Sequence, residues 1–210
     1  PESIAAVGAI RKSSLIYRIL ERIELHLYRS AKAIIVVTNS FKTKIEGNGI
    51  SPEKIEVIKN GVDSSKFQPI PKNQQLIEEL GLNNKFIVGY IGTHGMAHAL
   101  DFILDCAKAI NNPNIHIILQ GDGAEKQNLQ KKAHNEAIEN VTFLPFVSKS
   151  EIKKYISILD VALVNLKKSD TFKTVIPSKI FENACMLKPI LHGVEGESKD
   201  IIEKYNAGVT

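Results

Sequence analysis

The sequence predicts an α/β fold built on a parallel, doubly wound β-sheet, and three observations support this. Short runs rich in β-branched residues alternate with segments of helical periodicity from residue 33 onward. Several of these runs are apolar throughout, as strands are when helices cover both faces of a sheet. Strand, helix and strand follow in series, which favours parallel pairing. The expected strands are 33–37, 54–58, 86–91, 115–119, 141–144, 161–164 and 189–192.

The 210 residues divide into two parts in this interpretation. Residues 1–60 are expected to be the end of one domain together with its hinge. Pro69 and Pro71 interrupt the alternation, so 61–85 is predicted to be a linker and 86–210 a Rossmann-like domain. The chain begins with proline and stops just after a helical pattern. We therefore expect a piece of a longer protein, whose second domain lacks its final helices.

The first long segment, 11–30, has the pattern of an amphipathic helix, with an apolar face of four residues and arginines elsewhere: Ile16, Ile19, Ile23 and Leu27 against Arg11, Arg18, Arg22 and Arg29. In one interpretation the apolar face packs on a neighbouring element. In another, the basic face meets anionic lipid headgroups, which would give peripheral membrane association.

Other helices are indicated by their periodicity and by their first residues. Segments 96–110 and 124–138 repeat apolar residues with the helical period. Ser148 and Glu151 form a capping-box pattern that predicts a helix ending near residue 159. Pro177 is expected to open one more helix, because proline suits the first helical turn.

The composition excludes several classes of protein. The net charge is +4, with 24% charged and 43% hydrophobic residues, as in ordinary globular chains. No apolar run approaches the roughly 18 residues of a membrane span, and no secretion signal is present, so we expect a cytoplasmic protein, placed at the inner face of the membrane if the amphipathic helix binds lipid. A small, dispersed charge and the absence of tryptophan argue against nucleic-acid binding. The two cysteines and six histidines show no metal-ligand spacing.

Two glycine-containing turns follow predicted strands. The first turn comprises Gly92, Thr93, His94 and Gly95, and His98 lies just beyond it at the start of a predicted helix. Free backbone N–H groups at such a place suit a phosphate. Gly121 and Asp122 follow the next strand in the same way. Both turns are expected at one edge of the sheet, where they can converge on a ligand, although each is also compatible with a plain turn, with Asp122 capping the following helix.

A third candidate element is the segment from Lys173 to Glu182. Pro177 and Ser178 open its helix, and Glu182 lies one turn further on, so its carboxylate can face the same cleft. A carboxylate there can accept hydrogen bonds from vicinal hydroxyls such as those of a ribose. Lys173 and Lys179 offer cations for a diphosphate. The plainer alternative is that these charged residues cover the outside of an amphipathic helix.

These motifs together resemble retaining GT-B glycosyltransferases of family 4. The resemblance covers most of the chain and is carried by residues 31–40, 54–63, 140–147, 160–163 and 177–182, with Phe67, Pro69 and Pro189. It implies a two-domain, metal-independent enzyme whose C-terminal domain binds a nucleotide-sugar, while the other domain holds the acceptor. Within the family, the turn at 93–95 and the run 171–179 resemble bacterial capsule and O-antigen enzymes, including N-acetyl-fucosamine transferases.

The family's functional residues map onto this sequence only in part. Glu182 matches the second glutamate of the Glu-x7-Glu motif, which holds the ribose, while the first glutamate falls on Thr174. The family's diphosphate-binding arginine and lysine fall on Thr93 and His98. Because a leaving diphosphate needs fixed donors, worth about 3–4 kcal/mol each, other groups are expected to replace these. The candidates are Lys173 and Lys179 as catalytic cations, the backbone of 92–95, and His98.

The resulting hypothesis is a glycosyltransferase that moves a sugar, with retention, from a UDP-sugar to a saccharide or lipid-linked acceptor in bacterial cell-surface polysaccharide synthesis. Backbone groups of Pro145, Phe146 and Val147 would read the base edge. The nucleotide-sugar is a co-substrate, and no cofactor is expected. Two alternatives stay open: a sugar-nucleotide epimerase, and a non-catalytic subunit that only binds a nucleotide-sugar. This piece alone is expected to be inactive, because a retaining transfer needs groups from both domains.

Overall fold

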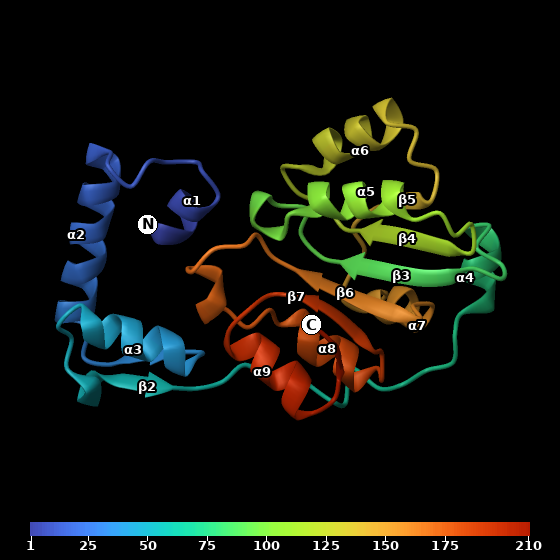
Figure 1. Cartoon of the computed structure of the whole chain (residues 1–210). Coiled ribbons are helices and arrows are strands. Elements are labelled where there is room, and N and C mark those ends of the chain that lie inside the picture. Colours follow the sequence, from blue (N-terminus) through green and yellow to red (C-terminus); the bar gives the residue numbers. More distant parts are fainter.

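The computed structural model describes all 210 residues and places them in two units (Figure 1). The larger unit is a six-stranded sheet with the order β5-β4-β3-β6-β7-β8, in which every neighbouring pair is parallel. Its strands are β3 (Phe86–Ile91), β4 (Ile115–Gln120), β5 (Val141–Leu144), β6 (Val161–Asn165), β7 (Ile190–Gly193) and β8 (Gly208–Val209). This confirms the predicted α/β, doubly wound sheet.

Helices cover both faces of this sheet, which explains its uniformly apolar strands. The helices α5 (Leu100–Ala109) and α6 (Lys126–Asn135) lie on one face, where Leu104 packs with Leu119 and Leu129 in an eleven-residue core cluster. The opposite face carries α4 (Gln74–Glu79), α7 (Ile152–Ser157), α8 (Lys179–Cys185) and α9 (Glu197–Lys204). Two short 3-10 turns, η2 (Met96–His98) and η3 (Phe172–Thr174), follow β3 and β6.

The smaller unit has its own small core. It contains α1 (Glu2–Ala6), α2 (Leu15–Ser30), β1 (Ile34–Val36), α3 (Asn39–Gly47), η1 (Pro52–Lys54) and β2 (Ile55–Val57). β1 and β2 form a two-stranded parallel sheet, and Ile34, Ile45 and Ile55 belong to a cluster of five buried residues that joins this sheet to α3. The chain then runs from this unit to β3 (Figure 1).

Polar contacts join the two units at the start of α3. The Thr38 hydroxyl donates a hydrogen bond to the Thr174 carbonyl at 2.9 Å. The Glu197 carboxylate, in the first turn of α9, accepts hydrogen bonds from the Ser40 amide at 2.5 Å and from the Ser40 hydroxyl at 2.6 Å, and a longer one from the Asn39 amide at 3.4 Å. Glu197 therefore satisfies N–H groups at the start of a helix in the other unit.

The structure departs from the sequence predictions in several places. Helix α4 lies within 61–85, where we expected a linker, and it is packed, because Ile77 and Leu82 are buried against the larger sheet. Strand β8 was not expected, since two residues carry no alternation. The predicted capping box does not form, because the Ser148 hydroxyl bonds the Glu151 carboxylate and α7 starts only at Ile152.

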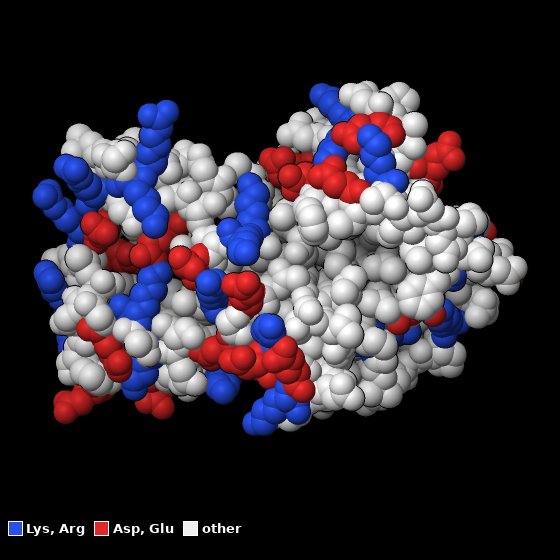
Figure 2. Space-filling model, in the orientation of Figure 1, with Lys and Arg blue, Asp and Glu red and all other residues white.

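One interpretation expected the apolar face of the amphipathic helix α2 to pack on a neighbouring element. In the structure this face does not pack on another part of the chain. Ile16, Ile19, Ile23 and Leu27 are 46–61% exposed, and Tyr17 is the buried residue of the helix. Figure 2 shows lysines and arginines spread over this end of the molecule. The helix therefore presents an uncovered apolar face beside basic side chains.

Candidate active site

The sheet order creates one position at which a ligand can enter. From β3 the chain proceeds toward β4 and β5, whereas from β6 it proceeds toward β7 and β8, so the connections leave these neighbouring strands in opposite directions. At such a switch point the loops diverge at the carboxyl ends of the strands and leave a crevice, which is the usual ligand site of open α/β sheets. The candidate residues follow β3, β4, β5 and β6.

The two glycine turns meet at this edge, as expected. The Gly92 amide donates a hydrogen bond to the Gln120 carbonyl at 2.9 Å, and the His94 amide donates one to the Asp122 carbonyl at 2.8 Å. A Cβ atom on Gly121 would lie 1.9 Å from the Gly92 carbonyl oxygen, and Gly121 has φ +140°. Only glycine permits this contact, so the close approach of the two turns is built into the sequence.

Two lysines lie at these turns, Lys179 and Lys126, and the Lys126 ammonium group donates hydrogen bonds to the Gly121 carbonyl at 2.7 Å and the Leu144 carbonyl at 3.1 Å. Lys179 is the one next to the first turn. It is the first residue of α8, and its Nζ lies 3.8 Å from the centroid of the Tyr90 ring. A Cβ atom on Gly92 would be 2.9 Å from the same Nζ, so the ammonium group is directly beside the first turn. Burial lowers the pKa of Lys179 to about 7, against a smaller opposing effect of Glu182. An anion placed here would restore the full positive charge.

Glu182 lies in α8 three residues after Lys179, so the two side chains share a face of this helix. It is half-buried, and burial raises its pKa while the charges of Lys149 and Lys179 act in the opposite direction. Because Lys179 lies beside Gly92, a side chain on the same face of α8 is expected to face the crevice. The Glu182 carboxylate has no hydrogen-bond partner within the chain, so it is available to accept hydrogen bonds from a ligand.

Lys173 lies apart from Lys179 and is already paired. Its Nζ is 2.9 Å from an Asp170 carboxylate oxygen and 3.3 Å from a Glu195 carboxylate oxygen. These contacts raise the pKa of Lys173, chiefly through the hydrogen bond from its ammonium group to Asp170. The sequence suggested that the two lysines act together on one diphosphate. In the structure the Lys179 ammonium group lies beside Gly92, whereas the Lys173 ammonium group contacts Asp170 and Glu195.

The two histidines of the first turn are neutral. His94 is fully buried and neither of its ring nitrogens has a partner, and the Nδ1 of His98 is also unpartnered. Burial lowers the pKa of each to about 4, and the positive charge of Lys126 adds to this effect at His94 and that of Lys179 at His98. That His98 takes the place of a diphosphate cation stays a prediction, because this imidazole is described here only without a ligand. It offers hydrogen bonds but no charge.

The remaining predicted residues surround the crevice. Asp122 does not cap α6, because its side chain accepts a hydrogen bond from the Gly123 amide at 2.8 Å within its own turn. Pro145 follows β5, and its carbonyl accepts a hydrogen bond from the Gln120 side chain at 3.1 Å. The other members are exposed or half-buried: Thr93, Gly95, Phe146, Val147, Pro177 and Ser178. Ser178 precedes α8 without a side-chain capping bond.

Three further side chains shape the crevice and were not predicted from the sequence. The Tyr90 hydroxyl donates to the Thr93 carbonyl at 2.8 Å, and the Asn165 side chain donates to the His98 carbonyl at 3.1 Å. Gln120 bonds to Pro145 as described. All three stand in the last two positions of otherwise apolar strands. Polar residues at strand ends were the signal that would have identified them.

No group of three or more His, Cys, Asp or Glu side chains is placed to hold a metal ion. No helix has the length and hydrophobicity needed to cross a membrane.

Two family models match the chain. "Glycosyl transferases group 1" matches residues 72–210, and "Glycosyltransferase Family 4" matches residues 8–66. The first match alone covers more than half of the sequence and includes every candidate residue named above. The chain belongs to the group 1 glycosyltransferases. The predicted resemblance is thus confirmed at the level of the group.

Named relatives of this group 1 chain come from bacteria. It is 24% identical over 211 residues to the probable glycosyltransferase WbjE of Pseudomonas aeruginosa, covering 99% of this chain and 52% of WbjE. It is 24% identical over 180 residues to WcaI of Escherichia coli, a putative colanic acid biosynthesis glycosyl transferase, covering 84% of this chain and 43% of WcaI. The chain thus spans about half the length of the curated relatives it matches.

Solved glycosyltransferase structures share the fold. HepE of Anabaena, crystallised with UDP and glucose, gives a TM-score of 0.74 at 21% identity, covering 86% of this chain and 49% of HepE. WaaG, a glycosyltransferase involved in lipopolysaccharide biosynthesis, gives 0.75 at 13% identity, covering 99% of this chain and 57% of WaaG. These likenesses confirm the GT-B architecture of the group 1 chain.

Proposed function

We propose that the protein to which this chain belongs transfers a glycosyl group, with retention, from a UDP-sugar to a saccharide or lipid-linked acceptor in bacterial cell-surface polysaccharide synthesis. Two observations support this proposal: the relatives WbjE and WcaI are named as glycosyltransferases, and the HepE structure contains UDP. The observation that carries it is the meeting of the two glycine turns with Lys179 at the switch-point crevice.

In the proposed site each group has one task. Backbone N–H groups of the first turn and the Lys179 ammonium stabilise the diphosphate as negative charge develops on the leaving group. The Glu182 carboxylate accepts hydrogen bonds from the two ribose hydroxyls. Backbone groups of 145–147 contact the base. The transfer would use no metal ion or other cofactor, so EDTA is expected to leave the rate of the whole enzyme unchanged.

Calorimetric titration of this chain with UDP tests the proposal. We expect saturable binding, and we expect Glu182→Ala to weaken it about 10- to 100-fold, because hydrogen bonds to a charged group are worth about 1.5–3 kcal/mol. Glu139→Ala, which removes an exposed carboxylate away from the crevice, serves as the matched control. A folded chain that does not bind UDP, or equal affinities for the Glu182 and Glu139 variants, would contradict the proposed site.

Product analysis separates transfer from the alternatives. NMR spectra of the whole protein's reaction should show a new glycosidic bond whose anomeric configuration matches the donor. An epimerase would instead release a changed nucleotide-sugar without any acceptor, and a non-catalytic subunit would leave the donor intact. The narrower N-acetyl-fucosamine specificity is tested by including that donor in the same assay.

Peripheral membrane association is a separate part of the proposal. The exposed apolar face of α2, with Arg18 and Arg22 on its other sides, suits an anionic membrane surface. Co-sedimentation with phosphatidylglycerol vesicles should fall for the double variant Arg18→Glu, Arg22→Glu. Unchanged sedimentation would contradict membrane association through this helix.

A further inference from the structure

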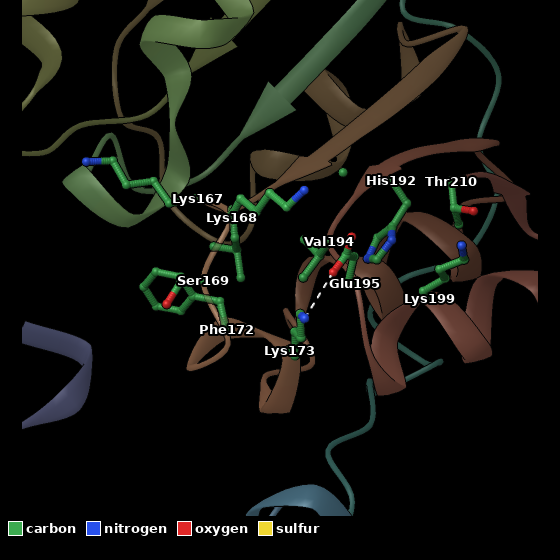
Figure 3. Close-up of a pocket in the computed structure, with 12 residues that line it drawn as sticks. Lys167, Lys168, Ser169, Phe172, Lys173, His192, Val194, Glu195, Lys199 and Thr210 are labelled. Carbon is green, nitrogen blue, oxygen red and sulfur yellow. Dashed lines mark ion pairs between the residues drawn. The ribbon is translucent and has the colours of Figure 1, made fainter. Parts of the chain in front are cut away.

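A second pocket lies next to the crevice, at the carboxyl ends of β6 and β7 (Figure 3). It encloses about 290 Å³ and is lined by four lysines, one histidine and one glutamate among its residues: Lys167, Lys168, Lys173, Lys199, His192 and Glu195. Its apolar floor is formed by Leu166, Phe172 and Val194. The loop after β6 and the loop after β7 supply the two walls.

This pocket adjoins the first turn. Ala97, which follows that turn in η2, packs against the floor residues. The Lys167 amide donates a hydrogen bond to the Ala97 carbonyl at 2.8 Å. Ala6 and Val7, at the end of α1, pack against the same floor from the smaller unit. The pocket therefore opens between the crevice and the smaller unit, where the reacting sugars would meet.

The charges of the lining are not balanced. Lys173 is shared by Asp170 and Glu195, and Lys199 is 3.5 Å from Glu203. Lys167 and Lys168 form no ion pair with any carboxylate of the chain. Figure 3 shows Lys168 on the same side as Lys173, Glu195 and His192, whereas Lys167 points away. Lys168 is thus the unpaired positive charge of the pocket.

His192 adds an unsatisfied hydrogen-bonding group. It lies in β7, is 3% exposed, and has no partner for either ring nitrogen. Burial keeps this imidazole neutral by lowering its pKa to about 4. A neutral imidazole still carries one N–H donor, and a buried donor without a partner is costly. A ligand oxygen in the pocket would remove that cost.

We propose that this pocket binds an anionic group, a carboxylate or a phosphate, carried by one of the two sugar substrates. The proposal rests on the glycosyltransferase function proposed above and narrows its substrates to an acidic donor sugar or a phosphorylated acceptor. Lys168 supplies the free charge, Lys173 a second ammonium group, and His192 the buried donor. A neutral hexose would leave these groups unmatched.

Calorimetry with three nucleotides tests whether the donor sugar carries the anionic group. UDP-glucose and UDP-glucuronic acid differ only at C6 of the sugar. UDP has no sugar, so its affinity measures binding to the crevice alone. If the anion belongs to the donor, UDP-glucuronic acid should bind at least about tenfold more tightly than UDP-glucose, because one charge-assisted hydrogen bond is worth about that much. Lys168→Ala should remove this difference. Lys131→Ala, an exposed lysine of α6 without an ion pair, should retain it.

Inorganic phosphate, used in place of a phosphorylated acceptor, tests whether the acceptor carries the anionic group. We expect phosphate, titrated with and without UDP, to shift the backbone amide NMR signals around Lys168 and His192, and Lys168→Ala to abolish these shifts. If UDP-glucuronic acid shows no advantage and phosphate causes no Lys168-dependent shifts, this proposal is overturned, even if UDP binds normally. If UDP fails to bind but phosphate still occupies the pocket, the function proposed above fails and the anion site stands.

Discussion

At the scale of single residues, Lys179 is the side chain whose charge depends most on a ligand. Its pKa of about 7 follows from burial. A diphosphate favours the ammonium form, so binding should raise this pKa and take up a proton. The two neighbouring imidazoles, His94 and His98, have pKa values lowered to about 4 by burial, well below that of Lys179.

The first prediction follows from this linkage. Affinity for UDP-glucose, whose two phosphates do not titrate near neutrality, should be high below pH 7 and fall about tenfold between pH 6 and pH 8, as free Lys179 loses its proton. Lys179→Arg should bind with little pH dependence, since arginine stays charged. Calorimetry across this range measures both effects. A flat profile for the unaltered chain would show that Lys179 does not meet the diphosphate.

The second prediction concerns Gly121. Gly121→Ala should lower the free energy of unfolding by about 2 kcal/mol or more, because alanine is strained at its φ of +140° and its Cβ would collide with the Gly92 carbonyl. UDP affinity should fall as well, since the two turns must separate. Gly47→Ala is the control, because it has open space and no positive φ. Denaturant unfolding that shows equal stability for both variants would contradict the packing of the turns.

At the scale of elements, the sequence predicts the presence of the long strands better than the short edge strand or the bounds of the helices. The bounds of β3 and β5 agree with the prediction, because β-branched and aromatic residues make up most of both strands. Strand β8 could not be predicted, since its pairing with Ile190 depends on a glycine that lets two backbones approach. Residues 96–110 were predicted as one helix, but Ala99, with φ +46°, divides η2 from α5.

The candidate site was predicted to a similar extent. The turns at Gly92 and Gly121 and the position of α8 follow from strand order, which periodicity reveals. The pairing of Lys173 with Asp170 and Glu195, and the burial of His98, depend on side-chain packing between segments distant in sequence. No local pattern carries that information.

The third prediction concerns α3, whose first amides are satisfied by Glu197 from the other unit. Glu197→Ala should destabilise the chain by about 1–2 kcal/mol, the usual effect of losing a helix cap. Hydrogen exchange at Asn39 and Ser40 should accelerate. Asp200→Ala, in the first turn of the same helix without a side-chain bond, is the control. Unchanged exchange in the Glu197 variant would mean that this contact does not hold α3.

At the scale of the whole molecule, the contacts of Thr38 and Glu197 hold the smaller unit against the loops that follow β6 and β7. Thr38 bonds directly to Thr174, within the segment that leads into α8. We therefore expect the arrangement of the two units to affect the geometry of the crevice. The exposed apolar face of α2 also concerns the whole molecule. Helical periodicity predicts that such a face exists, but it does not predict which surface binds to it.

The fourth prediction tests this coupling. The double variant Thr38→Val, Glu197→Ala should increase the radius of gyration measured by small-angle X-ray scattering, because it removes the polar contacts at the start of α3. Asp200→Ala should leave it unchanged. An identical radius for the double variant would show that other contacts fix the two units.

The central claim is that the crevice between β3 and β6 binds the diphosphate of a nucleotide-sugar. An NMR titration of the isotopically labelled chain with UDP-glucose tests it most directly. We expect the largest amide shifts to fall on residues 92–95, 121–123 and 179–182. Saturable binding whose shifts lie elsewhere, with these three segments unmoved, would contradict it.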